Sequence, residues 1–349
     1  MNRHFHYYAI RAIAKQAGFN EAEAETLAYA SQYVDDATEH KGIPIAKAPP
    51  EADDQHIAGL FEPVCTAHAG IQYLAAGKKD VQRKVYIPFH FVPAKAYNGN
   101  GPFDYRVAPG GEFALALLEL GLGAIRDTQD IDGTPRLRAL IKTGIALHSY
   151  ADTWSHQRFS GRRSPEDNDI QDRERWEKGE FRGLGFFERA VLDAMLDIGH
   201  AEAATMPDVS SLRWRYKHDD SGQVYDRNNT DDFTTAAMDI LGHLCAATGT
   251  TAPDIEARVH AALLDDKNSL RSWSSQFPDA FATDPKTYDP KRWRREALDG
   301  NHDWDKFEDA ADFAGLFLKY AGDLKWFLFH VEAGKQRDYV VRRIRQDLR

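Results

Sequence analysis

The sequence has few cysteines and none of the common nucleotide-binding or serine-hydrolase motifs. Its 349 residues include only Cys65 and Cys245, which lie far apart in the sequence. Two cysteines cannot form a disulfide framework or a thiolate zinc site, so any metal site would have to use histidine and carboxylate ligands. GxGxxG, Walker and GxSxG patterns are also missing. The sequence therefore contains no motif typical of a nucleotide-binding loop or of a serine hydrolase.

The chain also lacks an apolar run of the roughly 20 residues that a membrane-spanning helix needs, so we expect no transmembrane segment. Its first residues, MNRHFHYYAIRAIAKQAG, contain histidine and arginine where a signal peptide would be apolar. This absence predicts a cytoplasmic protein, with signal-independent export as the alternative. The formal net charge of −10 argues against a stable complex with nucleic acid.

The most informative stretch present is TPRLRALIKTGIALHSYADTWSHQRFSG, residues 134–161. Threonine followed by proline is typical of a helix start. Steps of three and four residues then place several side chains on one helical face: Leu137, Ile141, Ile145, His148, Asp152 and His156. This face turns from apolar to ionisable without a break, and buried ionisable groups need partners. The pattern favours a metal site, with a hydrogen-bonded polar network as the alternative.

Other regions offer further ligands of the same kinds. Asp35 closes a helix rich in small residues, and His90 lies on a proline-interrupted apolar segment. A buried helix predicted over residues 183–208 presents His200 behind an apolar row. Glu202 would lie about 200° around that helix from His200. The two side chains could therefore share a metal only if the backbone departs from a regular helix.

Three stretches in this order, LAYASQYVDDA, IPFHFV and ALHSYADTWSH, resemble the zinc-dependent phospholipase C superfamily. That superfamily includes single-strand-specific nucleases of the same all-helical fold, and the chain is most similar to an uncharacterised microbial branch. The resemblance covers roughly residues 1–208. It implies zinc ligands at seven positions: His6, Asp35, His90, His148, Asp152, His156 and His200.

The sequence departs from the family pattern at three points, one of which is a gap from Asp152 to the next histidine that is shorter than in the phospholipases. The family carboxylate that follows the last histidine by four residues is Ala204 here, which leaves Glu202 as the candidate. Secreted members also bind one zinc through the amino group of an N-terminal tryptophan, whereas this chain begins Met-Asn-Arg-His. The resemblance thus implies two or three zinc ions.

From these patterns we expect an all-α fold, a multi-helix bundle with one small β-hairpin near residues 212–226. Residues 1–210 would form a metal-binding helical core, and residues 211–349 a helical extension packed on it as part of one globular unit. The charged stretch 162–180 is expected to be an exposed connector.

The predicted function is a zinc-dependent phosphodiester hydrolase that acts on a phospholipid or another phosphodiester. The resemblance implies that Asp152 bridges two metals and that Asp35 binds one metal and orients the attacking water. Arg158 and Arg162 follow the ligand helix directly and are candidates for binding the phosphate. The alternatives are a single-strand nuclease with the same metal core and a non-catalytic helical metal-binding or interaction protein. The oligomeric state stays open.

Overall fold

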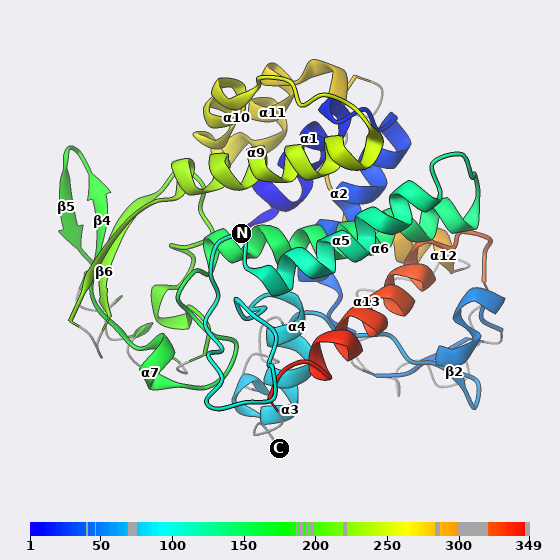
Figure 1. The fold of residues 1–349 in the computed structure, drawn as a ribbon, viewed down its shortest axis with the longest axis horizontal. Coiled ribbons are helices and arrows are strands. Elements are labelled where there is room, and N and C mark those ends of the chain that lie inside the picture. Colours follow the sequence, from blue (N-terminus) through cyan, green and yellow to red (C-terminus); the bar gives the residue numbers. More distant parts are fainter. Residues whose placement is uncertain are drawn as a thin grey trace.

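The computed structural model describes residues 1–39, 41–45, 47–68, 75–185, 188, 191–192, 195, 198–218, 222–282, 287–298 and 320–345. It combines helices with two antiparallel sheets (Figure 1), one of three strands and one of four. The prediction of an all-α fold is therefore wrong, and the chain has a mixed helical and sheet fold. Among the described residues, no helix is long and apolar enough to cross a membrane.

The long helices pack around one central helix, α6, which the sequence pattern had indicated. Their bounds are α2 (Glu21–Asp36), α5 (Glu112–Asp127), α6 (Thr134–Ser155), α9 (Asn229–Thr248) and α13 (Lys325–Val341). Helix α6 contacts each of the other four, and in Figure 1 it runs beside α5 through the middle of the molecule. Nearly all of its side chains from Ala139 onward are buried. The position of α6 therefore decides where its histidines and aspartate lie.

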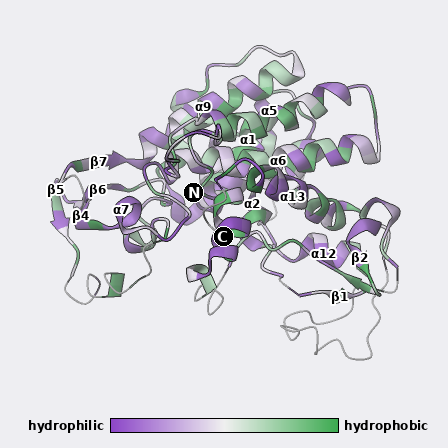
Figure 2. Cartoon of the chain, turned by 60° about the horizontal axis from the view of Figure 1, so that its bottom comes forward, coloured by the Kyte–Doolittle hydropathy of each residue, from purple (hydrophilic) through white to green (hydrophobic). Residues whose placement is uncertain are grey.

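The remaining helices are short and connect or cover the central group. They are η1 (His4–Ala9), α1 (Ile10–Gln16), η2 (Pro50–Gln55), α3 (Lys79–Val81), η4 (Gln82–Tyr86), α4 (Ile87–Phe89), α7 (Pro165–Asn168), η5 (Ala201–Ala203), α10 (Glu256–Leu263), η6 (Asp266–Asn268), α11 (Ser269–Gln276), η7 (Pro278–Ala280) and α12 (Arg292–Ala297). Figure 2 shows apolar residues gathered in the central helices, whereas the sheet on one side is mostly hydrophilic. Hydrophobic burial thus holds the helical part together.

Helices α2 and α6 approach each other closely at Gly144. A Cβ atom at this position would lie 2.6 Å from both the Ala30 Cβ and the Leu27 carbonyl oxygen. Glycine is therefore needed for the two backbones to meet at this distance. The contact fixes the end of α2, where Asp35 lies, against the middle of α6.

The larger sheet has the strand order β5-β4-β6-β7. Its strands are β4 (Ile170–Glu177), β5 (Glu180–Gly183), β6 (Arg213–His218) and β7 (Val224–Asn228), and all neighbouring pairs are antiparallel. The hairpin expected near 212–226 corresponds to β6 and β7, but it is only half of this sheet. The smaller sheet joins β1 (Ile43–Pro44), β3 (Leu60–Phe61) and β2 (His56–Ile57) in that order.

Strand β4 lies inside the stretch that we expected to be an exposed connector. Its sequence, IQDRERWE, does not alternate apolar and polar residues, so it gives no strand signal. The buried members are Ile170 and Arg173, and a bulge separates Gln171 from Glu174 in the pairing with β6. The bulge shifts the inward-facing positions away from a simple period of two.

The helix predicted over 183–208 lies partly outside the described residues. From Ile198 onward the prediction is wrong, because the chain forms an isolated bridge to Arg163, a turn and the short η5. Gly199 and Ala204 have positive φ angles of 58° and 49°. Left-handed backbone at these two positions cannot continue a right-handed helix.

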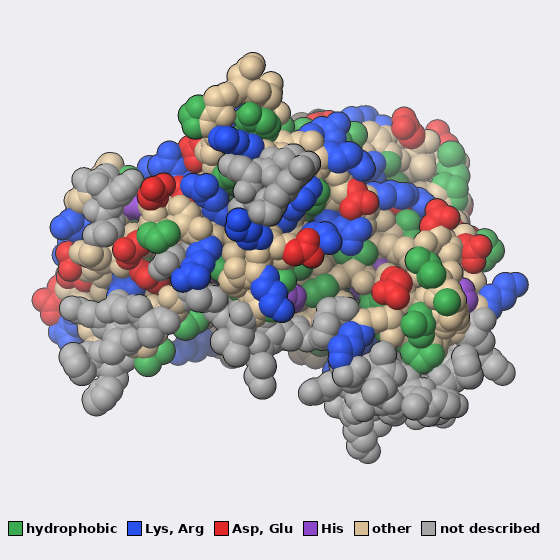
Figure 3. All heavy atoms as spheres, turned by 90° about the horizontal axis from the view of Figure 1, so that it is seen from below, with side chains coloured by type: hydrophobic (Ala, Val, Ile, Leu, Met, Phe, Trp, Pro, Cys, Tyr) green, Lys and Arg blue, Asp and Glu red, His purple; other side chains and the backbone are tan. Residues whose placement is uncertain are grey.

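Charge is unevenly distributed over the surface. In the view from below (Figure 3), Lys and Arg side chains gather across the middle of the face, and most acidic side chains lie toward its sides. The net charge of −10 therefore hides local regions of positive charge.

Candidate metal centre

Helix α6 brings three ionisable side chains to one place in the interior. His148 and Asp152 lie one turn apart and are 0% and 1% exposed, and His156 follows at the C-cap. The spacing that the sequence showed therefore continues into the structure as one buried face. Burial of such groups is costly unless each has a partner, so the neighbouring elements must supply the partners.

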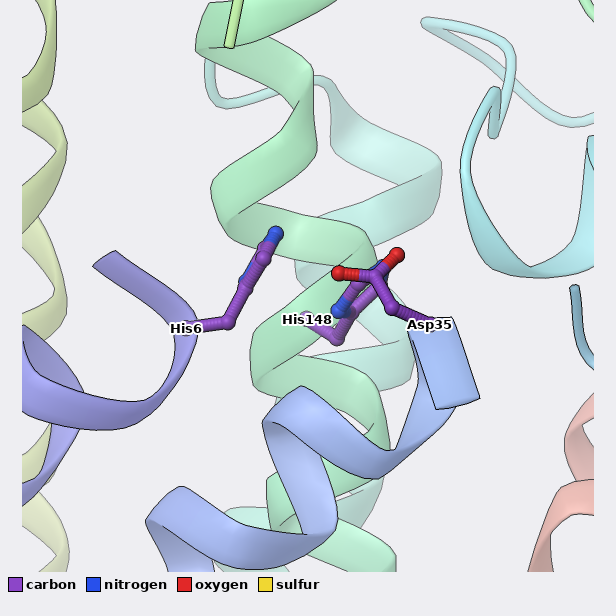
Figure 4. Close-up of side chains that lie close together, drawn as sticks. All are labelled: His6, Asp35 and His148. Atoms are coloured by element: carbon purple, nitrogen blue, oxygen red, sulfur yellow. The ribbon is translucent and has the colours of Figure 1, made fainter. Parts of the chain in front are cut away.

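Three other elements point side chains at this face of α6. His6 comes from η1 and stacks on His148 with ring centroids 3.9 Å apart. Asp35 comes from the last turn of α2, and His90 caps the end of α4. Figure 4 shows His6 and Asp35 approaching His148 from opposite sides. Their atoms form one of three groups of His and Asp whose ligand atoms all lie within 4.8 Å of one another.

The first cluster consists of His90, His148, Asp152 and Asp35. The His148 Nε2 atom lies 3.1 Å from the His90 Nδ1 and 3.2 Å from the Asp152 Oδ2, and the latter two atoms are 3.4 Å apart. An Asp35 oxygen lies 3.7 and 3.8 Å from the same two ring nitrogens. Four ligands at zinc–nitrogen and zinc–oxygen bond lengths on a tetrahedron would be about 3.3 Å apart. The cluster therefore has the spacing of a tetrahedral cation site.

The second cluster consists of His156, His200 and Asp208. One Asp208 oxygen lies 3.2 Å from the His156 Nε2, and its other oxygen lies 3.4 Å from the His200 Nε2. Two imidazole nitrogens thus face a single carboxylate at distances close to those of the first cluster. This set could hold a second cation.

Asp152 lies between the clusters, and its two oxygens face different neighbours. Oδ2 faces His90 and His148, whereas Oδ1 lies 3.0 Å from the His6 Nε2. The α-amino group of Met1 is buried beside the same Oδ1 and lies 3.1 Å from an Asp208 oxygen. A carboxylate with partners on both oxygens has the placement that a bridging ligand requires.

Backbone carbonyls orient three of the histidine rings. The His90 Nε2 donates to the Thr66 carbonyl at 2.9 Å, the His156 Nδ1 to the His90 carbonyl at 2.8 Å, and the His200 Nδ1 to the Ala204 carbonyl at 2.9 Å. In each ring the other nitrogen faces a carboxylate of the clusters. Metal-binding histidines are commonly held in this way.

Electrostatics favours cation-binding protonation states at four of the groups but not at His90 and Asp35. Burial opposes protonation of His90, yet Asp152 and Asp35 raise its pKa, and burial raises the pKa of Asp35. Burial opposes ionisation of Asp152 and Asp208, but neighbouring histidines and the Met1 amine hold the pKa of both carboxyls well below the usual range. Burial lowers the pKa of His6 well below its ordinary value, and it also lowers the pKa of His156. Ionised carboxylates and neutral imidazoles are the forms that ligate metals.

The Met1 amine supplies a positive charge near these carboxylates. Burial disfavours its charged form, yet Asp152 and Asp208 together outweigh burial and raise the pKa of the amine to about 10. One ammonium cannot balance these two carboxylates together with Asp35. The cluster thus keeps an excess of negative charge that cations would neutralise.

The clusters open onto a cavity of about 360 Å³. One part of its lining is the ligand set itself, including Asp35, Asp152 and Asp208. The other part is mainly apolar: Ala67, Tyr86, Phe91, Met195, Ile198, Ala201 and Ala204. Asp35 is 32% exposed at its side chain, so it is the carboxylate with the best access to the cavity. The clusters are therefore accessible from one side.

Three of the predicted site residues lie elsewhere. Glu202 is buried but turns away, where its carboxylate accepts the Ile170 backbone N–H at 3.1 Å and lies 3.5 Å from Arg173. Arg162 pairs with Asp167 at 2.9 Å. Arg158 lies over the Tyr225 ring, 4.1 Å from its centroid. Neither arginine lines the cavity that holds the clusters.

Sequence reasoning missed Asp208 and the Met1 amine. Asp208 follows His200 by eight residues, beyond the positive-φ residue Ala204 and Pro207, so no helical spacing links it to the histidine. Its only sequence signal is an acidic residue after a proline where the helix was expected to end. The amine belongs to the backbone and has no side-chain signature.

Comparison with curated proteins and with solved structures finds no match to this chain. A family model does match residues 1–344, a span that contains every residue of the clusters. The family is described only as one of unknown function, so it assigns no role to these residues. The chain belongs to this family of unknown function, DUF6765.

Proposed function

We propose that this protein is a metal-dependent phosphodiester hydrolase, with zinc as its metal. The observation that carries the proposal is a continuous set of five histidines and three aspartates: His6, His90, His148, His156, His200, Asp35, Asp152 and Asp208. The ligand atoms of the first cluster have nearly tetrahedral spacing, and the set borders a cavity with an apolar wall. Contiguous cation sites that share a carboxylate suit chemistry at a phosphodiester, where charge develops on several oxygens.

The donor set favours zinc over harder cations. Imidazole nitrogens outnumber carboxylates, and calcium or magnesium would prefer oxygen donors alone. The proposed ligands of the first ion are His90, His148, Asp35 and Asp152, and those of the second are His156, His200 and Asp208. A third ion would use His6 and the Asp152 Oδ1.

Bound metals would lower the pKa of a water molecule and neutralise negative charge on the phosphoryl oxygens. The chain's own residues would position this water molecule and accept its proton. Asp35 is the half-exposed carboxylate on the cavity, and burial raises its pKa although His148 and His90 oppose the increase. A carboxylate with a raised pKa beside the cavity is suited to orient a water molecule and take its proton.

The cavity wall favours a substrate with an apolar part. Phe91, Ile198 and the nearby alanines offer contact area for a chain or ring, and no Lys or Arg is among the described residues that line the cavity. A polyanion such as DNA would gain little from such a wall. A phospholipid or a small apolar phosphodiester therefore fits better than nucleic acid, and single-stranded DNA remains the comparison substrate.

The first test is metal content and activity of the purified full chain. We expect two or three equivalents of zinc and hydrolysis of phosphatidylcholine or bis(4-nitrophenyl) phosphate that exceeds hydrolysis of single-stranded DNA. Asp152→Asn should lower activity by at least about 100-fold. Absence of stoichiometric metal, or full activity of the variant, would refute the proposal. Stoichiometric metal with no activity on any phosphodiester would favour a non-catalytic metal-binding protein.

A matched pair of variants tests the assignment of the second cluster. Asp208→Asn should remove about one equivalent of zinc, because one of its oxygens faces each of the two imidazoles. Glu202→Gln should leave the metal content unchanged and affect stability only, since its carboxylate bonds to Ile170 and Arg173. The reverse result would mean that Glu202, and not Asp208, is the carboxylate ligand of the second cluster.

A further inference from the structure

A second cavity, of about 400 Å³, lies between α5, α6 and α13, and none of the described residues lines both this cavity and the metal cavity. Its floor is apolar, with Leu117 and Ala124 from α5 and Ala139 and Ala146 from α6. Leu117 and Ala139 are buried. The volume lies within the range of pockets that hold small molecules, roughly 300–1,000 Å³. We call this cavity the α13 groove.

Four cations and one carboxylate surround the apolar floor. The cations are Arg138, Lys142, Lys335 and Arg342, and the carboxylate is Glu332. The whole chain carries a net charge of −10, so the charge of this groove is opposite to the average. Clefts lined by one sign of charge attract ligands of the other sign.

Glu332 neutralises only part of that charge. Its buried side chain, 3% exposed, lies 3.3 Å from Arg138 and 2.7 Å from Lys335. Among the residues that the structure describes, Lys142 and Arg342 have no carboxylate partner. Lys142 is also half-buried, and a partly buried ammonium without a counter-charge is unfavourable. The groove thus has two uncompensated cations next to an apolar floor.

We propose that the α13 groove binds an alkyl or acyl chain that ends in a phosphate monoester. The chain would cover the apolar floor, and the phosphate would lie between Lys142 and Arg342. A phosphate monoester carries a charge of about −1.5 to −2 at neutral pH, which matches two free cations. A fatty acid would balance only one of them, and a neutral lipid neither. Because no described residue lines both the groove and the metal cavity, the proposal does not depend on the proposed function.

Binding of dodecyl phosphate to the full, metal-loaded chain tests this directly. Calorimetry below the micelle concentration should show one site, with dodecanoate weaker by about tenfold and dodecanol weaker still, since one charge-assisted contact is worth about a factor of ten. The double variant Lys142→Met/Arg342→Met should weaken dodecyl phosphate by about tenfold or more. Lys84→Met, an exposed lysine paired with Asp80, is the matched control and should leave binding unchanged.

A second variant guards against a folding defect in the first. Leu120 is 44% exposed and lines the groove, so Leu120→Glu should fold normally and repel the phosphate. Equal binding of dodecyl phosphate and dodecanol would overturn the proposal, as would binding that survives both variants. Binding lost in Asp152→Asn but kept in the groove variants would place the ligand in the metal cavity. Tighter binding of an acidic amphipathic peptide, or dimer formation through the groove, would also overturn it.

Discussion

The two ends of α6 place charged side chains in opposite surroundings. At the C-terminal end, His148 and Asp152 are fully buried among further histidines and aspartates, and the local charge is negative. At the N-terminal end, Arg138 and Lys142 lie at the edge of an apolar groove, and the local charge is positive. One helix therefore carries groups that could hold a cation in the interior and groups that could bind an anion at the surface.

The difference shows how burial selects the kind of ligand. Deep in the protein, short side chains with fixed rings can be held at cation-binding distances by backbone carbonyls, as Thr66 holds His90. At the groove, long flexible cations keep access to water while their stems cover apolar surface. We therefore expect perturbations of the C-terminal end to be large and those of the groove to be small.

Metal removal should have the largest effect, and it should affect the C-terminal end of α6 more than the N-terminal end. Chelation of zinc should lower the free energy of unfolding by more than about 4 kcal/mol if free zinc exceeds its dissociation constant 1,000-fold. Hydrogen exchange should then rise around His148 and Asp152 before it rises around Arg138 and Lys142. Calorimetry and exchange mass spectrometry measure both effects. An identical melting temperature with and without chelator would contradict the comparison.

Gly144→Ala should have the next largest effect, because the new Cβ would collide with Ala30 and with the Leu27 carbonyl oxygen at 2.6 Å. Overpacking of this kind costs about 3 kcal/mol, and a shift of α2 would move Asp35 away from His148. Chemical denaturation and zinc analysis should show a loss of stability and weaker metal binding. Gly242→Ala in α9 is the control, since nothing lies within 4 Å of its Cβ position, and it should be neutral or slightly stabilising. Equal effects of the two changes would refute the close-contact explanation.

His330 provides a pH-dependent contrast, since it is a buried histidine on α13 outside the clusters. Burial lowers its pKa to about 3, and its Nδ1 accepts the Val64 N–H at 3.1 Å. The unfolded chain would protonate this histidine near pH 6.5, whereas the folded protein would not, so stability falls as pH decreases below that value. His330 should account for about 2.5 kcal/mol of the decrease in the free energy of unfolding between about pH 7.5 and about pH 4.5. His330→Gln should flatten the pH dependence of unfolding over this range, and an unchanged slope would contradict the assignment.

Lys142→Met should give the smallest effect. With no ligand bound, removal of an unpaired half-buried charge at the groove should change stability by less than about 0.5 kcal/mol, and zinc content should stay the same. Urea denaturation and metal analysis check both points. A loss of zinc or of several kcal/mol would mean that the two ends of α6 are coupled.

Much of the metal centre could be predicted because its main element is local. Helical periodicity alone places His148, Asp152 and His156 on one face of α6. The contributions of Asp35 and His90 came from their positions at a helix end and on a proline-bounded segment, together with the family resemblance. The structure brings all five residues together.

Other features depended on contacts that periodicity does not encode. The charged strand β4 is stabilised by pairing with β6 and by the buried Arg173–Glu202 pair, so its own sequence carries no alternation. The same pair accounts for the orientation of Glu202, whose carboxylate faces Ile170 and Arg173 and not His200.

The sequence by itself determined the helix that carries the ligands and the kinds of ligand it offers, because helical spacing is a property of neighbouring residues. Only the tertiary structure decided which carboxylate joins His200. Positive-φ backbone at Ala204, between Glu202 and Asp208, turns the chain, and Asp208, not Glu202, faces the histidines. The tertiary structure also packs α6 against α5 and α13, and as a result Lys142 and Arg342 border one groove. These outcomes depend on where distant segments pack, and no local spacing contains that information.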